Sequence, residues 1–177
     1  MINIIVAVNE SFQIGNSKTN TLLYRIKNDM VRFKQLTMNS YCVMGRLTYE
    51  SLNSPLIGRT NVILTGNKNF KIDEELYDKY DIIVEHDFEK ILNHYKFSGE
   101  QDKDFNIIGG SYLFAEGIHW ADYIYLTMIH DSDNKNGDIY FPKFELSNFK
   151  EVSREKHYDE DSDLYYSYIN YKRKVGI

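Results

Sequence analysis

An acidic residue stands on the apolar side of a predicted helix near the N-terminus. Apolar side chains recur there at helical spacing, at Ile26, Met30, Phe33 and Thr37. Asp29 falls on or beside this stripe, where an acid is unexpected. An apolar wall raises the pKa of a carboxyl. Such a group is suited to pairing with the N–H donors of a ligand or to helping deliver a proton.

The same segment also has a purely structural interpretation. Asn28 or Asp29 would fit as a residue that caps the helix or opposes its positive end. On this segment alone the capping interpretation is slightly favoured. Three polar residues of the helix, Arg25, Arg32 and Gln35, are expected to face solvent.

Two strand-to-helix turns have the composition of phosphate-binding turns. Gly45 permits close approach of a ligand to the backbone, while Arg46 and Thr48 add a charge and a hydroxyl donor. Gly109 and Gly110 follow a buried strand and open a helix. A lone glycine pair usually marks only a tight turn. Two such turns in one small chain favour a dinucleotide.

Other polar residues are less informative. Arg59, in the loop at residues 54–61, would suit a bidentate grip on a carboxylate, but without other support it is an ordinary surface arginine. The five histidines lack metal-ligand spacing. The single cysteine, Cys42, excludes a cysteine-based zinc cluster and is interpreted as a small buried hydrophobe. No metal is expected.

The pattern of elements predicts how these residues are positioned. Near-continuous apolar runs indicate buried strands at residues 2–8, 41–44, 61–64, 81–84 and 105–108. Helical patterns alternate with them at residues 27–36, 47–52, 88–95 and 112–116. Strands follow at 123–129, 151–157 and 164–171, with a charged turn at 158–163. We therefore predict an α/β fold whose central, mostly parallel mixed sheet has flanking helices and a C-terminal antiparallel hairpin.

Composition sets broader limits. A length of 177 residues with 42% hydrophobic content predicts one domain spanning residues 1–177. The formal net charge of -5 argues against a nucleic-acid partner. No stretch resembles a membrane span, and the apolar N-terminus lacks a basic leader, so no membrane partner and a cytoplasmic location are expected. Tyrosine-rich final strands leave monomer and homodimer open.

Several short motifs follow one another in a characteristic order over nearly the whole chain. They are Ile4–Ala7, Ile14-Gly15, Asp29 with Phe33-Lys34 and Thr37, Met44-Gly45-Arg46-x-Thr48, Gly58-Arg59-x-Asn61-x-Ile63-Leu64, Ile107–Gly110, Tyr125-Leu126-Thr127, and Gly137-Asp138 followed by Phe141-Pro142. In order and spacing they resemble the dihydrofolate reductase family. The resemblance implies NADPH-dependent reduction of 7,8-dihydrofolate to 5,6,7,8-tetrahydrofolate, through protonation at N5 and hydride transfer to C6. It also implies a place in one-carbon and thymidylate metabolism, and binding of dihydrofolate and antifolate-type small molecules.

The resemblance also implies roles for individual residues. Catalysis would fall to Asp29, Thr127 and Tyr24, with Thr127 hydrogen-bonded to Asp29. Substrate-binding residues would be Ile5, Asp29, Phe33, Leu52, Leu56, Arg59, Ile108 and Thr127. Cofactor-binding residues would be Ala7, Ile14, Gly15, Gly45, Arg46, Thr48, Leu64, Thr65, Gly109, Gly110, Ser111, Tyr112 and Leu113. Residues 16–23 would form a mobile lid over the site.

The chain departs from the family pattern at several positions. Leu23 and Tyr24 stand where bacterial members usually carry Pro-Trp. Leu47 and Tyr112 stand where many carry His and Arg against the cofactor's 2′-phosphate, so discrimination against NADH is expected to be weaker. Two rival functions remain open. One is a reductase of the same fold acting on a ribosylated pyrimidine in flavin synthesis, and the other is a nucleotide-binding or assembly protein without catalysis.

Overall fold

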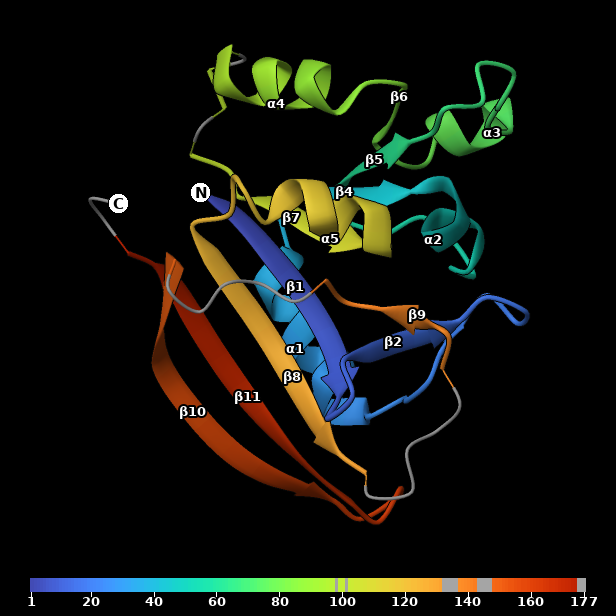
Figure 1. Cartoon of the computed structure of the whole chain (residues 1–177). Helices are drawn as coiled ribbons and strands as arrows, with labels where there is room; N and C mark the ends of the chain where they lie inside the picture. Colours follow the sequence, from blue (N-terminus) through green and yellow to red (C-terminus); the bar gives the residue numbers. More distant parts are fainter. Residues whose placement is uncertain (98, 101, 132–136, 143–147, 175–177) are drawn as a thin grey trace.

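A computed structural model describes residues 1–97, 99–100, 102–131, 137–142 and 148–174. Its centre is an eight-stranded sheet in the order β10-β11-β8-β1-β7-β4-β5-β6 (Figure 1). The strands are β1 (Ile2–Asn9), β4 (Tyr41–Gly45), β5 (Thr60–Leu64), β6 (Ile82–Glu85), β7 (Phe105–Gly109), β8 (Tyr123–His130), β10 (Phe149–Asp159) and β11 (Leu164–Arg173). β11 is antiparallel to both its neighbours, β8 and β10, whereas the strands from β8 to β6 in this order run parallel to one another.

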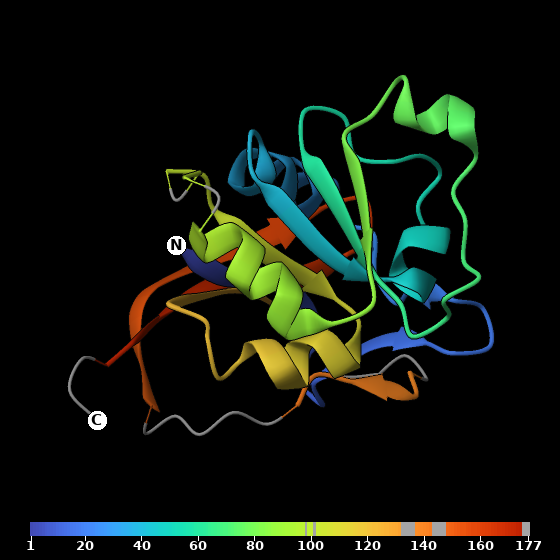
Figure 2. The same cartoon turned by 90° about the horizontal axis from the view of Figure 1, so that it is seen from above.

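Helices cover both faces of this sheet. They are α1 (Lys27–Thr37), α2 (Arg46–Glu50), α3 (Glu74–Tyr77), α4 (Phe88–Phe97) and α5 (Ser111–Gly117). α1 lies behind the sheet in Figure 1, whereas α4 and α5 lie in front, and Figure 2 shows the same two layers from above. The predicted α/β class, its mostly parallel sheet and its C-terminal hairpin are confirmed, with element ends within a few residues of those predicted.

The sequence did not predict a second, three-stranded sheet. It contains β2 (Gln13–Asn16), β3 (Thr21–Leu22) and β9 (Ile139–Tyr140), in the order β3-β2-β9. Part of the segment expected to be a lid is therefore paired in strands. These strands have only two to four residues each, which hides them from any periodicity argument. The sheet lies beside the carboxyl end of β1 (Figure 1).

The central strands are apolar because the sheet is buried on both faces. Ile4, Val43 and Ile107, on adjacent strands, are fully buried. Cys42 is buried as well, and burial raises the pKa of its thiol to about 11. This confirms its interpretation as a small hydrophobe rather than a reactive thiol.

Two buried asparagines tie α1 to the sheet. The side-chain amide of Asn3 donates to Asn106 Oδ1 at 3.0 Å. Asn106 in turn donates to Ser40 Oγ at 2.8 Å and to the Leu36 carbonyl oxygen at 3.3 Å, both near the end of α1. Hydrogen bonds between fully buried groups are costly to break, so they hold α1 in a defined position on the sheet.

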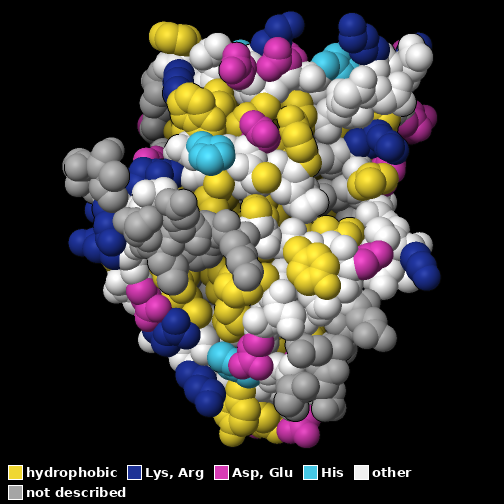
Figure 3. Space-filling view, in the orientation of Figure 1, with side chains coloured by type: hydrophobic (Ala, Val, Ile, Leu, Met, Phe, Trp, Pro, Cys, Tyr) yellow, Lys and Arg dark blue, Asp and Glu magenta, His cyan; other side chains and the backbone are white. Residues whose placement is uncertain are grey.

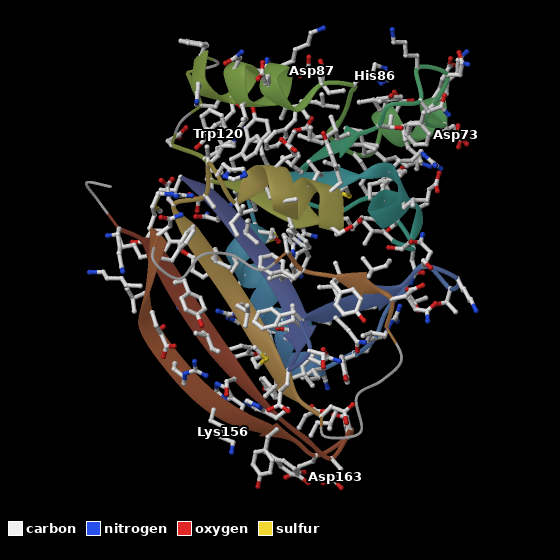
Figure 4. The ribbon with its side chains drawn as sticks, viewed as in Figure 1. Asp73, His86, Asp87, Trp120, Lys156 and Asp163 are labelled. Atoms are coloured by element: carbon white, nitrogen blue, oxygen red, sulfur yellow. The ribbon has the colours of Figure 1, made fainter. Side chains whose placement is uncertain are left out.

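Charged groups lie mainly at the periphery. On the face in Figure 3, acidic and basic side chains are interspersed around separate groups of hydrophobic atoms. Figure 4 shows Lys156 and Asp163 at the far end of the β10–β11 hairpin, while His86 and Asp87 lie at the opposite end of the molecule. Within the described residues no helix is long and apolar enough to cross a membrane.

Candidate active site

The sheet opens between β1 and β7 at their carboxyl ends. The β1–β7 ladder ends at the pair Ile4–Ile107. Beyond it β1 continues beside β8, whereas β7 continues beside β4. The helices that follow β1 and β7 lie on opposite faces, the arrangement that creates a ligand crevice in open α/β sheets. Ile5 and Ile108, expected to bind substrate, directly follow this last pair and flank the opening.

Asp29 lies at one side of this opening, and it is not a helix cap. The N-cap residue of α1 is Ile26, and no side chain caps the helix. Instead the Thr127 hydroxyl, from β8, donates to Asp29 Oδ1 at 2.6 Å. The capping interpretation of Asn28 or Asp29 is therefore wrong, because the first turn points the carboxyl toward the sheet rather than back along the helix. The Thr127–Asp29 hydrogen bond implied by the family resemblance is present.

Burial dominates the electrostatics of Asp29. It raises the pKa of the Asp29 carboxyl, while the hydrogen bond from Thr127 and the charge of Arg32 act in the opposite direction. The net pKa remains above the ordinary value of an aspartate. A carboxyl with a raised pKa, half-buried at the opening of a sheet, is suited to proton chemistry.

Two expectations for α1 were wrong. Met30, assigned to the buried stripe, is 49% exposed, and Arg32, expected to face solvent, is half-buried over the sheet. Asp29 and Arg32 form the side of α1 that contacts β8, and Met30 lies outside that contact. The long side chain of Arg32 instead reaches across β8 to β11, where its guanidinium lies over the ring of Tyr168.

The expected substrate-binding residues come from α1 and from the loop before β5. Phe33 on α1 is half-buried, and Leu52 and Leu56 are half-buried against the apolar core beneath this loop. Arg59 is half-buried, donates to Thr37 Oγ1 at 3.3 Å, and has a buried Nε without a protein partner. It also borders a hollow of about 300 Å³. A surface arginine would not carry a desolvated, unpaired N–H, so Arg59 remains a good candidate to bind a carboxylate.

The two glycine turns adjoin in space. A Cβ atom added to Gly45 would lie 3.7 Å from the Gly110 nitrogen and 3.9 Å from the Gly109 oxygen. Thr48 Oγ1 would lie 3.5 Å from a Cβ on Gly109 and 3.6 Å from one on Gly110. Gly109 has φ +128°, which favours glycine. The fold thus joins two turns far apart in sequence into one surface of backbone and hydroxyl groups.

The other expected cofactor-binding residues are spread around these turns. Ala7 lies near the end of β1, and Ile14 and Gly15 lie in β2. Leu64 ends β5 and Thr65 follows it, while Ser111, Tyr112 and Leu113 begin α5. Tyr112 is 66% exposed, whereas Leu113 is buried in the core. Arg46 Nη1 donates to both carboxylate oxygens of Glu50, at 2.7 and 3.0 Å. Glu50, one helical turn after Arg46, was not among the predicted site residues.

The expected lid, residues 16–23, is held by hydrogen bonds that were not predicted from the sequence. Ser17 donates to Asp138 through its backbone N–H, at 2.7 Å, and through its hydroxyl. These bonds lower the pKa of Asp138. The Asn20 amide donates to the Leu47 carbonyl oxygen at 2.8 Å and so connects the lid to α2. The landmark pair Gly137-Asp138 was a signal for the first contact, but its partner could not be read from sequence.

Tyr24 lies in a different environment from Asp29. It is buried against Ile129 and Tyr166, and its hydroxyl donates to Asp131 Oδ2 at 2.9 Å. The amide of Asn9 donates to the Tyr24 hydroxyl at 3.5 Å. These partners lie at the ends of β1 and β8. Tyr24 is therefore packed and hydrogen-bonded, and it anchors the chain just before α1. Its catalytic role stays a prediction.

Comparisons with known proteins agree with this geometry. A sequence model of the family described as Dihydrofolate reductase matches residues 1–173. Dihydrofolate reductase of Bacillus subtilis (strain 168) is 31% identical over 180 residues, covering 98% of this chain and 95% of that protein. The enzyme of Lactococcus lactis is 31% identical over 170 residues, covering 95% and 94%. A solved structure of dihydrofolate reductase from Enterococcus faecalis, complexed with NADP(H) and RAB-propyl, superposes with a TM-score of 0.82 at 30% identity, covering 98% of this chain and 96% of that one. Sequence, fold and site geometry together show that the chain belongs to the dihydrofolate reductase family.

Proposed function

We propose that this chain reduces 7,8-dihydrofolate to 5,6,7,8-tetrahydrofolate with NADPH, in support of one-carbon and thymidylate metabolism, and that residues 1–177 act as one domain. The observation that carries the proposal is the hydrogen bond between half-buried Asp29 and buried Thr127 at the opening of the sheet. Its relatives are dihydrofolate reductases, which supports the substrate class, and the NADP(H) complex of the Enterococcus faecalis protein supports the cofactor.

The substrate side of the opening suits a flat pterin with a carboxylated tail. The two carboxylate oxygens of Asp29 accept hydrogen bonds from N–H groups of the pterin, while Ile5 and Ile108 flank the ring. Phe33 packs on the aromatic part of the tail. Arg59 binds the tail's α-carboxylate, which would satisfy its buried and unpaired Nε.

The cofactor side suits a pyrophosphate and two ribosides. The Gly45 and Gly109–Gly110 turns leave a surface without side chains, beside the Thr48 hydroxyl. A Cβ at Gly45 would fill this space, which is the fit that a closely bound phosphate requires. NADPH, when bound, supplies the hydride for the reaction.

Asp29 supplies the protonic half of the reaction. Reduction adds a hydride to C6 and a proton to N5, so the two additions together saturate the C6–N5 bond. When Asp29 is ionised, its negative charge in the desolvated opening favours a protonated pterin over a neutral one. The lid, held by Ser17 and Asp138, excludes water while the reacting rings are in contact.

The rival reductase of ribosylated pyrimidines shares this fold, and the site distinguishes the two. Arg59 with an unpaired guanidinium N–H suits a carboxylate, which a ribosylated pyrimidine lacks. Steady-state assays of NADPH oxidation with each substrate test the choice. Turnover of the pyrimidine with no turnover of dihydrofolate would reverse the proposal, and turnover of neither would support a non-catalytic role.

Asp29→Asn provides the direct test of mechanism. We expect kcat at neutral pH to fall by about 10² to 10⁴, the usual contribution of a positioned acid or base, while NADPH binding followed by protein fluorescence is retained. Asp161→Asn, in the exposed β10–β11 turn, is the matched control and should keep wild-type activity. Unchanged turnover in Asp29→Asn would remove the central residue from the mechanism.

A further inference from the structure

Arg32 lies one helical turn after Asp29 and shares its side of α1. Its guanidinium is half-buried over β8 and β11, although an arginine at this position was expected in solvent. Burial lowers the pKa of Arg32, and nearby negative and polar groups, with Asp29 the strongest, oppose that effect. A desolvated guanidinium of this kind requires fixed partners.

Four side chains fix this guanidinium. Nη2 donates to Asn170 Oδ1 at 2.7 Å, and Nη1 donates to Thr127 Oγ1 at 3.3 Å. The guanidinium carbon lies 4.2 Å from the ring centre of Tyr168 and 6.0 Å from that of Tyr125. Tyr125 and Thr127 are alternate residues of β8, and their register partners on β11 are Asn170 and Tyr168. All four therefore stand on one face of the sheet and form a rigid seat.

These contacts determine the direction of the hydrogen bond to Asp29. A guanidinium only donates, so the Thr127 oxygen must accept from Arg32. The one proton of the Thr127 hydroxyl is then directed to Asp29 Oδ1, 2.6 Å away. Without Arg32 the hydroxyl would be free to rotate and to accept from another donor.

Among the described residues, Arg32 supplies the positive charge that acts on the Asp29 carboxyl. The Asp29 carboxyl responds to burial, to Thr127 and to Arg32. Tyr125 and Tyr168 also face this region, and burial raises the pKa of both, so both are neutral at physiological pH. From β10, Glu155 acts on Arg32, and His157 packs against the Tyr168 ring.

We infer that Arg32 is a positioning residue for Asp29. Arg32 directs the Thr127 proton to the Asp29 carboxylate and supplies the positive charge that balances this carboxylate in the apolar opening. The inference deepens the proposed function, since it concerns the pH range in which Asp29 would serve catalysis. An opposite charge favours the ionised carboxylate, so the pKa of Asp29 should rise when Arg32 is neutralised.

The test compares three substitutions in ligand-free protein. Arg32→Met removes charge and donor, Arg32→Gln removes charge but keeps an N–H donor, and Arg32→Lys keeps the charge. Each protein is labelled with ¹³C at aspartate carboxyls, and the Asp29 signal, assigned by its loss in Asp29→Asn, is titrated. We expect the Asp29 midpoint to move to higher pH in the Met and Gln variants and to stay near that of wild type in the Lys variant.

A kinetic readout accompanies the titration. In single-turnover hydride transfer, the ratio of the rate on the alkaline limb to that on the acid plateau should rise about threefold or more in Arg32→Gln, because each pH unit on that limb is worth roughly tenfold. A purely structural role would lower Tm and all rates equally without moving either midpoint, and that result overturns the inference. If Arg32→Met does not fold, the Gln and Lys pair still decides. The carboxyl titration needs no turnover, so failure of the proposed function would be separately visible as absence of dihydrofolate reduction in the wild type.

Discussion

The two sides of the opening are built in different ways. On the substrate side, Asp29, Thr127 and Arg32 form a buried chain of side chains anchored on α1 and β8. On the cofactor side, the contact surface is made by backbone at Gly45 and Gly109–Gly110, while side chains such as Tyr112 and Leu47 remain largely exposed.

This difference predicts how each side tolerates substitution. A desolvated polar network loses function when one functional group is removed, because the remaining groups are left unpaired. A backbone surface is insensitive to most side-chain changes but cannot accept an added atom. The substrate side should therefore respond to the removal of atoms, and the cofactor side to their addition.

Gly45→Ala tests the cofactor side with the largest expected effect. The new methyl group meets the Gly109–Gly110 turn only at ordinary contact distances of 3.7 and 3.9 Å, so the free protein should keep its Tm. It would occupy the space of a bound phosphate, and overpacking of about 1–3 kcal/mol corresponds to roughly tenfold to hundredfold in the Kd of NADPH. Thermal unfolding and a fluorescence titration with NADPH measure the two effects.

Gly66→Ala is the matched control, since its methyl group would meet nothing within 4 Å. It should change neither quantity. Equal affinity for NADPH in Gly45→Ala and wild type would show that the cofactor does not approach this turn. A large loss of Tm in Gly45→Ala would show that the glycine serves the fold instead.

Periodicity and turn composition were enough to predict most of the fold. The buried strands from Ile2 to Gly109 are apolar because both of their faces are covered, and that signal is local. β2, β3 and β9 were missed because two- and four-residue strands carry no periodic signal. They pair because tertiary contacts bring them together.

The active site was predicted less evenly. Asp29 could be singled out because an acid on an apolar stripe breaks a local rule. Arg32 was misplaced because its partners, Tyr168 and Asn170, come from strands more than a hundred residues away, and no spacing argument brings β11 next to α1. The Arg46–Glu50 pair is a different case, because it joins residues four apart within α2, and that spacing was a local signal that the prediction did not use.

Thr127→Val tests the substrate side by removing one hydroxyl at nearly constant volume. We expect kcat to fall about tenfold, as for loss of a hydrogen bond to a charged group. Because the Thr127 bond lowers the pKa of Asp29, the pH–rate profile should also move to higher pH. Thr60→Val is the control for stability alone, because it removes a buried hydroxyl of β5 that donates to Asp81. A similar change in both variants would assign the effect to folding.

Ser17→Ala tests whether the lid contributes to hydride transfer, the step that joins the substrate side and the cofactor side of the opening. It removes the hydroxyl donor to Asp138 and keeps the backbone donor, so we expect hydride transfer to slow by about threefold with little change in Tm. The bond requires ionised Asp138, whose pKa is lowered by Ser17. The difference from wild type should therefore persist across neutral pH and disappear only as pH falls through that lowered pKa. A difference that instead grows on acidification would contradict the assignment.

Glu50→Gln gives the smallest expected effect and the finest test of the comparison. Glu50 holds Arg46 through two hydrogen bonds at a partly exposed site, where an ion pair contributes about 0–1 kcal/mol. Releasing Arg46 should lower the KM for NADPH about twofold, leave the KM for NADH unchanged, and lose its effect at high salt. Glu151→Gln, which breaks the similar pair with Arg154 on β10, should change neither constant. If the KM for NADPH does not move, Arg46 does not contact the 2′-phosphate, and the cofactor side would be recognised through its backbone alone.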